Sequence, residues 1–171
     1  MSDWQFCFLS DEYYIDFPDD CLMRNKEIVD GKYADRPCFF AFRDNQNEAI
    51  LWLIPISSRY DKYKRIYDKN IERYGKCTTI RFGEVLGTQA AFLISNMCPA
   101  TEKYIREVYI DKNNKPISID NRIVRDVVTN AKDVLAKVNR GTKLIFPDVL
   151  TIKKALLVDL EKNQNSESTS D

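Results

Sequence analysis

Residues 37–56 read PCFFAFRDNQNEAILWLIPI, and this stretch decides the fold. Its two apolar ends, Pro37–Phe42 and Glu48–Ile56, have the composition and length of β-strands. The five polar residues between them are typical of a hairpin loop. Pro55 falls near the end of its strand, where a strand tolerates proline. Because both strands are almost entirely apolar, we expect an antiparallel hairpin at the centre of a sheet.

Shorter strands are expected before and after this hairpin. The segment Trp4–Leu9 has aromatic residues at alternate positions, as a strand does. Ser10 follows it and is suited to cap a short helix, which the Phe17-Pro18 pair would end. Three later segments also read as strands: Thr78–Arg81, Gln89–Ser95 and Lys103–Ile110. The last of these allows a helix after Pro99 as an alternative.

The C-terminal third changes to a helical period. Asp120 is suited to cap the start of a helix of about 20 residues and Gly141 its end. A second helix is expected after Pro147-Asp148. The apolar face of the first helix consists of Ile123, Val124, Val127, Val128, Ala131, Val134, Leu135 and Val138. Strands early and helices late predict an α+β domain with a mainly antiparallel sheet flanked by helices.

The chain has 171 residues, which predicts a single domain. We expect this domain to span residues 1–160 and a disordered polar tail to follow over residues 161–171, where no residue is apolar. No apolar run approaches the length of a membrane span, and the first residues do not resemble a secretory signal. We therefore expect a cytoplasmic protein with no membrane association.

The available residue types narrow the chemistry. The sequence has no histidine, which excludes Ser-His-Asp triads, Cys-His pairs and HExxH zinc sites. The five cysteines are odd in number and no two have C-x-x-C spacing, so we expect buried thiols in place of disulfides or a zinc site. Any acid–base group must be a Lys, Arg, Tyr, Asp, Glu or Cys side chain, and we expect no metal or other cofactor.

The net charge is zero, but the charges are unevenly distributed. Residues 59–76 hold seven bases and three acids, whereas residues 1–20 hold six acids and no base. On a helix, bases and aromatic residues of 59–76 fall on opposite arcs of about 80° each. The basic arc contains Lys62, Arg65, Lys69, Arg73 and Lys76, and the apolar arc contains Tyr60, Tyr63, Tyr67, Ile71 and Tyr74. We expect the tyrosines to pack on the sheet and the bases to face outward.

Two interpretations of the basic arc stay open at this point. It is either a solvated helix face or a surface that binds an anion. The absence of an acid from the arc favours the second, because like charges on one side of a helix repel unless an anion relieves them. A phosphate backbone is the expected anion.

The order of these elements, together with the segment IPISSR at residues 54–59, resembles a known family. The chain is similar to the type III toxin–antitoxin endoribonucleases, the ToxN/AbiQ family, and within it to the CptN-like branch. The similarity includes the opening strand with its Ser-capped helix and Tyr33 shortly before the Arg36-Pro37 pair. The aromatic strand, the strand that ends in Ile-Pro-Ile-Ser-Ser and the long late helix complete it.

The resemblance implies a fold, an activity and partners. The implied fold is the twisted antiparallel sheet of the Kid/MazF toxins, with flanking helices. The implied activity is metal-independent cleavage of cellular or phage RNA, in which the RNA's own 2′-OH attacks and a 2′,3′-cyclic phosphate remains. The implied partner is a small antitoxin RNA, folded as a pseudoknot, which the enzyme cuts from a precursor and which inhibits it in a closed protein–RNA assembly. Such systems act in phage defence.

The resemblance also implies roles for particular residues. Ser58 would contact the scissile phosphate or the 2′-OH, Ser57 would orient a phosphate oxygen, and Tyr33 would transfer a proton or position the sugar. Two family lysines are missing, because Arg59-Tyr60 follows the serines and Arg36 or Cys38 lies where the other is expected. For the cation at the phosphate we expect Arg59, then Arg36, then Lys62. The expected RNA-binding face consists of Lys62, Lys64, Arg65, Lys69, Arg73 and Lys76.

Other interpretations of the same residues stay open. A Ser-Ser pair at a strand end often only satisfies local backbone groups. Tyr33 and Arg36 also fit ordinary loop positions, and Asp44 is typical of a turn. For the whole chain, the alternatives are a non-catalytic module that binds structured RNA, or a protein-interaction domain whose acidic N-terminal region meets a basic partner.

Overall fold

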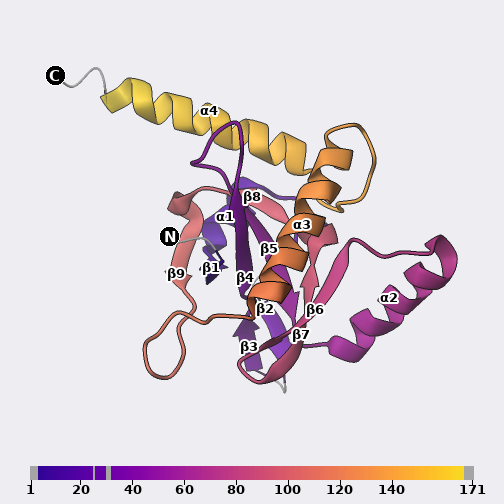
Figure 1. Ribbon diagram of the computed structural model, residues 1–171. Helices are drawn as coiled ribbons and strands as arrows, with labels where there is room; N and C mark the ends of the chain where they lie inside the picture. Colours follow the sequence, from indigo (N-terminus) through magenta and orange to yellow (C-terminus); the bar gives the residue numbers. More distant parts are fainter. Residues whose placement is uncertain (1–3, 25, 30–31, 168–171) are drawn as a thin grey trace.

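The computed structural model describes residues 4–24, 26–29 and 32–167, and for residues 26–29, 32–34 and 164–167 it describes the backbone only. A seven-stranded sheet forms the centre, in the order β6-β7-β5-β4-β1-β9, with β8 paired to β5 (Figure 1). Each described pairing in it is antiparallel. The strands are β1 (Phe6–Leu9), β4 (Cys38–Arg43), β5 (Leu51–Ser57), β6 (Ile80–Val85), β7 (Thr88–Leu93), β8 (Cys98–Ala100) and β9 (Ile105–Val108). The predicted α+β class is confirmed.

The predicted hairpin is the centre of this sheet. β4 and β5 pair antiparallel, with Phe39 opposite Ile54. On β5, Trp52 and Ile54 belong to the hydrophobic cluster on one face, whereas Leu51 and Leu53 belong to the cluster on the other face. Apart from Arg43 and Ser57 at their ends, both strands are apolar, because side chains alternate between two covered faces.

Helices cover the two faces. α3 (Asn121–Val138) packs on the first face, and its residues Val127, Ala131 and Val134 are fully buried against the sheet. The predicted cap is present, because the Asp120 carboxylate accepts a 2.6 Å hydrogen bond from the Arg122 N–H. α1 (Asp11–Asp16) and α4 (Val149–Glu167) contribute to the opposite cluster. None of the helices in the described ranges is both long and apolar enough to cross a membrane.

The last helix runs further than the sequence predicts. α4 continues to Glu167, so it includes part of the range 161–171 that was expected to be disordered. No glycine or proline interrupts the chain between residues 149 and 167, and glutamate and lysine favour helices. Residues 168–171 lie outside the described residues.

Three short elements were missed by the sequence analysis. β2 (Lys26–Val29) and β3 (Lys32–Asp35) form a separate two-stranded antiparallel sheet. β8 pairs with β5 through Trp52 and Pro99. Such short, mixed segments lack the alternating pattern from which a strand is predicted. The expected strand at residues 103–110 is also shorter, because a single 3₁₀ turn at Glu102–Tyr104 precedes β9.

Candidate active site

A pocket of about 270 Å³ opens where β5 ends, and it contains three of the residues predicted for the site. Ser57 is the last residue of β5, Ser58 follows it, and Arg36 lies between β3 and β4. The other lining residues come from β3 and the residues before β4, from β5, from the β6–β7 hairpin and from the segment after β9: Asp35, Pro37, Ile56, Val85, Leu86, Thr88, Gln89, Ala90 and Tyr109. The sheet pairing brings these segments together, because β5 lies between β4 and β7.

The two serines differ in burial and bonding. Ser57 is buried, and its Oγ accepts a 3.3 Å hydrogen bond from the Arg59 N–H. This contact fits the local-backbone interpretation that the sequence left open. Ser58 is exposed and lines the pocket, so its hydroxyl is accessible to a ligand there.

Arg36 is the predicted cation that lines the pocket. The residue is 8% exposed, and its Nη1 donates a 3.1 Å hydrogen bond to the Ile56 carbonyl oxygen. That bond anchors the guanidinium to the end of β5, one residue before Ser57. A buried arginine held in this way offers a fixed positive charge at the pocket.

Asp35 brings an acid to the same pocket that the sequence analysis did not single out. Its Oδ2 accepts a 2.7 Å hydrogen bond from Arg106 Nη2, and the two side chains form an ion pair at the surface. Arg106 also lies over the Phe8 ring, 5.3 Å from the centroid. The only sequence signal for Asp35 was its position beside Arg36, because its partner Arg106 is 71 residues away.

Arg59 is not among the described residues that line the pocket. Tyr33 lies in β3, two residues before Asp35, and pairs with Ile28 of β2. Its side chain lies outside the described residues. Arg59 is exposed and immediately precedes α2 (Tyr60–Tyr74), to whose first turn Lys62 belongs.

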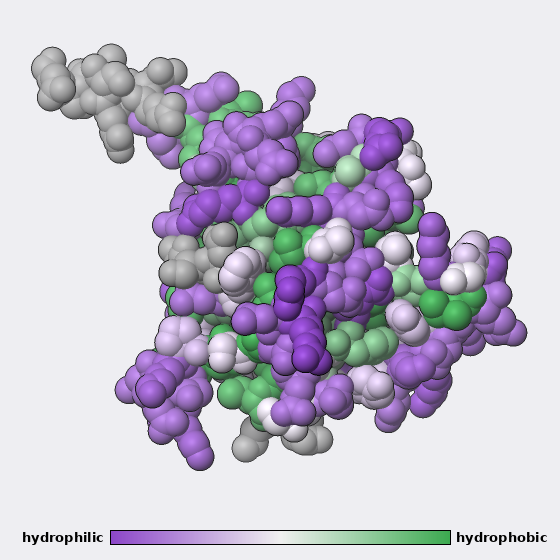
Figure 2. All heavy atoms as spheres, in the orientation of Figure 1, coloured by the Kyte–Doolittle hydropathy of each residue, from purple (hydrophilic) through white to green (hydrophobic). Residues whose placement is uncertain are grey.

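Four of the five residues of the basic arc lie on a helix, as predicted, whereas Lys76 follows the Gly75 cap at the end of that helix. α2 extends away from the sheet (Figure 1), and hydrophilic side chains cover most of this projection, with a small hydrophobic patch among them (Figure 2). All five residues of the basic arc are exposed: Lys62, Arg65, Lys69, Arg73 and Lys76. Lys64 forms an ion pair with Asp68 one turn away, and its hydrogen bond to that carboxylate raises the pKa of the lysine.

The apolar arc of α2 only partly packs on the sheet. The rings of Tyr60 and Tyr67 lie 5.0 Å and 5.4 Å from the Phe82 ring of β6. The expectation that the apolar arc packs on the sheet is wrong for the last turns of α2, because Ile71 and Tyr74 are 38% and 61% exposed. The helix is longer than the surface that it contacts, so its end extends beyond the sheet.

The cysteines do not supply a reactive group at this site. Cys38 is buried, and this burial raises the pKa of its thiol well above the usual value. Burial also raises the pKa of Cys7 and Cys98 to about 12. All five cysteines are free thiols, and Cys21 is exposed, contrary to the prediction of burial. Within the described residues, no group of three or more acidic or cysteine side chains is arranged to hold a metal ion.

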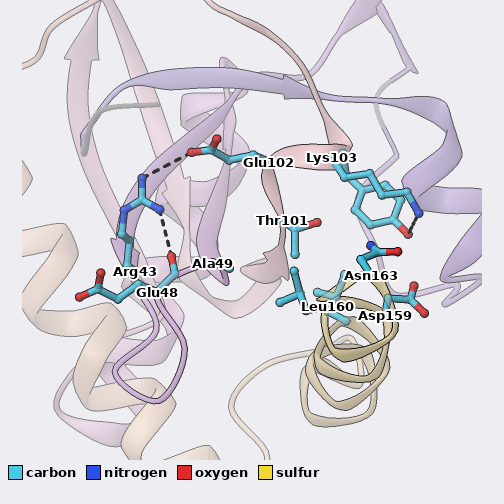
Figure 3. A pocket seen from close by; sticks show the side chains of 11 residues that line it. Arg43, Glu48, Ala49, Thr101, Glu102, Lys103, Asp159, Leu160 and Asn163 are labelled. Carbon is cyan, nitrogen blue, oxygen red and sulfur yellow. Dashed lines mark hydrogen bonds and ion pairs between the residues drawn. The ribbon is translucent and has the colours of Figure 1, made fainter. Parts of the chain in front are cut away.

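A second cavity, of about 440 Å³, lies between α4, the β4–β5 loop and the turn before β9 (Figure 3). Arg43 donates to the Glu48 carbonyl oxygen at 2.9 Å and pairs with Glu102 at 3.5 Å. Tyr104 donates to Asp16 Oδ2 at 2.7 Å, and burial raises the pKa of this phenol. These polar groups bond to one another, and no predicted site residue whose side chain the structure describes lines the cavity, so we favour the pocket at Ser58 as the site.

Comparison with known proteins bears on the fold. No protein-family model and no curated protein matches the sequence. Among solved structures, the chain is similar to AbiQ, a lactococcal anti-phage endoribonuclease belonging to the type III toxin–antitoxin system, with a TM-score of 0.67 and 12% identity. The match covers 94% of this chain and 99% of that chain. The chain therefore shares its fold with AbiQ, as the resemblance read from the sequence predicts.

Proposed function

We propose that this protein is an endoribonuclease toxin of a type III toxin–antitoxin system. The observation that carries the proposal is the pocket at the end of β5, where the exposed Ser58 and the buried Arg36 line one cavity. A hydroxyl and a fixed guanidinium are suited to hold a phosphodiester. The fold shared with AbiQ supports the same activity.

In the proposed reaction, the 2′-oxygen of the RNA forms a bond to the adjacent phosphorus while the bond from phosphorus to the 5′-oxygen breaks. The product is a 2′,3′-cyclic phosphate and a free 5′-hydroxyl. One group takes the proton from the 2′-OH, and another gives a proton to the leaving oxygen. The reaction needs no metal, because the nucleophile belongs to the substrate.

The residues take the following roles in this proposal. Ser58 Oγ contacts the phosphate or the 2′-OH, and Ser57 fixes the backbone at the start of α2. Arg36 stabilises the negative charge that develops on the phosphate oxygens. We assign this role to Arg36 before Arg59 and Lys62, because it alone of the three lines the pocket. Tyr33 and Asp35, both in β3, are the candidates for proton transfer.

The basic face of α2 supplies the path for the RNA outside the pocket. The helix begins two residues after Ser58, and Lys62 and Arg65 lie on its first two turns. RNA that enters the pocket would continue along this face, with its phosphates near the exposed lysine and arginine side chains. The same face would bind the small pseudoknot antitoxin RNA in a closed assembly. Release of the toxin from this RNA would give it a role in phage defence.

The test compares the wild type with Ser58→Ala in a chelator-containing buffer. We expect the variant to lose at least about a hundredfold in cleavage rate, while its fold and its affinity for RNA persist. The wild-type products should end in a 2′,3′-cyclic phosphate. Ser118→Ala, which removes a hydroxyl from an exposed position outside the pocket, should cleave like the wild type.

Two results would contradict the proposal. Full cleavage by Ser58→Ala would remove the assigned site. RNA binding by the wild type without any product would favour the non-catalytic RNA-binding module in place of the nuclease. When the gene is expressed from its native operon, the purified protein should also carry a discrete short RNA. A raised ratio of absorbance at 260 nm to that at 280 nm would reveal this RNA.

A further inference from the structure

The turn between β6 and β7 has a residue that does not suit it. Val85 pairs with Thr88, so Leu86 and Gly87 form a two-residue loop. Their φ angles are 51° and 75°, and two positive values indicate a type I′ turn. Asparagine, aspartate or glycine is usual at the first position, because a bulky side chain is strained there. Leucine at this position therefore needs an explanation.

Packing does not supply that explanation. Leu86 is 55% exposed, and it belongs to none of the hydrophobic clusters of the described residues. Its neighbour Val85 is buried, so the hairpin already has its core contact. An exposed apolar side chain held in a strained conformation is the kind of feature that occurs at ligand clamps. Leu86 lines the pocket that contains Ser58.

Tyr109 lines the same pocket from the segment after β9. The ring is half-buried and lies 5.0 Å from the Phe8 ring, at an interplanar angle of 58°. The backbone of Tyr109 is also fixed, because its N–H donates a 2.7 Å hydrogen bond to the Phe6 carbonyl oxygen. Tyr109 therefore offers an aromatic surface, on a fixed backbone, in the pocket that the serines line.

The size of the pocket limits what it holds. Its volume of about 270 Å³ lies below the range of about 300–1,000 Å³ that is usual for drug-sized ligands. One nucleobase with part of its ribose fits within such a volume. Unpaired bases in single-stranded RNA are commonly held by aromatic stacking and apolar contact.

We propose that Leu86 and Tyr109 together hold one unpaired nucleobase of the RNA, next to the phosphate that Ser58 contacts. The inference rests on the proposed endoribonuclease function and names the part of the substrate that this site recognises. Leu86 makes the apolar contact and Tyr109 the stacking contact. Strain at the turn is retained because Leu86 contacts the RNA, and the fold itself does not require it.

The experiment replaces Leu86 by the residue that the turn prefers. Leu86→Asn creates an Asn-Gly pair, which is the favoured sequence for a type I′ turn. We expect the melting temperature to stay constant or rise, while kcat/KM on single-stranded RNA falls about tenfold. Tyr109→Leu should lose a similar factor, and Tyr109→Phe, which keeps the ring, should retain most of the activity. Leu150→Asn, at another exposed leucine, on α4, is the control and should leave kcat/KM unchanged.

Binding of a non-cleavable RNA, with the attacking 2′-OH replaced by hydrogen, separates this inference from the proposed function. Weaker binding by Leu86→Asn supports the nucleobase site even if the wild type proves to cleave nothing, a result that would remove the nuclease proposal alone. Equal binding and equal cleavage by wild type and Leu86→Asn overturn the inference. A loss of stability in Leu86→Asn also overturns it, because the leucine would then serve the fold.

Discussion

The helices α2 and α3 share an amphipathic pattern, but only α3 is buried against the sheet along its apolar face. α3 buries Val124, Val127, Ala131 and Val134, whereas no residue of α2 is buried. The apolar side of α3 consists of aliphatic residues, mainly valines, and that of α2 consists mainly of tyrosines. A helical pattern thus predicts which face turns inward, but the residue types determine how firmly the helix is held.

The difference separates stability from function. α3 and α4 close the two faces of the sheet, and we call them the packed helices; α2, the projecting helix, has its exposed bases beside the candidate site. Changes in the packed helices should therefore lower the free energy of unfolding. Changes on the outer face of α2 should alter RNA binding and leave stability intact.

The largest effect on stability is expected where α4 is tied to the β4–β5 loop. Lys153 Nζ lies 2.8 Å from Asp44 Oδ2, and Trp52 Nε1 donates to the same oxygen at 2.9 Å. Lys153→Met would leave a buried carboxylate without its cation, and we expect it to lower the free energy of unfolding by about 3 kcal/mol. Lys154→Met, at the exposed neighbour, should change it by less than about 0.5 kcal/mol. Urea unfolding of both variants measures the difference; equal stability would contradict the assigned role of the pair.

The same carboxylate makes stability depend on pH. Burial raises the pKa of Asp44, but hydrogen bonds from Lys153 and Trp52 outweigh burial, so the pKa lies below its usual value. Because the folded pKa is lower than the unfolded value of about 3.9, this group stabilises the fold fully above that pH. Its contribution is lost as the pH falls through the folded pKa.

Urea unfolding at a series of pH values tests this dependence. The difference in free energy between wild type and Asp44→Asn should be largest near neutral pH and should shrink below about pH 4. A difference that stays constant down to acid pH would mean that the Asp44 charge contributes nothing to the fold.

The Asp44 network also marks a limit of the sequence analysis. Asp44 was interpreted as a turn residue, and it does accept a hydrogen bond from the Gln46 N–H in the turn. Its second role depends on Lys153, 109 residues later in the chain, and no local pattern indicates such a pair. The central hairpin was predictable because its signal lies within 20 consecutive residues.

A smaller effect is expected where α3 approaches β6. A methyl group on Gly83 would lie 2.8 Å from both Ile123 Cδ1 and Cγ2, which is closer than atoms pack. Gly83→Ala should therefore lower the free energy of unfolding by about 1 kcal/mol, because the half-exposed Ile123 can move aside in part. In the Ile123→Ala background, the same change should cost less. An equal cost in both backgrounds would mean that this contact does not hold α3.

The candidate site follows the same division between local and distant signals. The sequence pointed to Arg36, which precedes the predicted hairpin, and to Ser57 and Ser58, which follow it. These residues do line one pocket. Leu86 and Tyr109 were missed because they join the pocket through strand pairing. The catalytic roles predicted for Ser57, Ser58 and Arg36 stay predictions.

The smallest change in stability is expected on the projecting helix. Arg65→Glu combined with Lys69→Glu reverses two exposed charges of the basic arc. Neither side chain is buried, so we expect the free energy of unfolding to change by about 0.5 kcal/mol or less for each. Affinity for single-stranded RNA should fall, and the slope of log K against log salt should decrease by about 1.4, because two phosphate contacts are lost.

The matched control reverses two exposed arginines on α3, one of the packed helices, through Arg122→Glu combined with Arg125→Glu. Both double variants change the net charge equally, so a general electrostatic effect would weaken RNA binding in both. Loss of affinity only in the α2 variant would locate the RNA path on the projecting helix. An equal loss of affinity in both variants would show that the protein attracts RNA through its total charge. The division of roles between α2 and α3 would then fail.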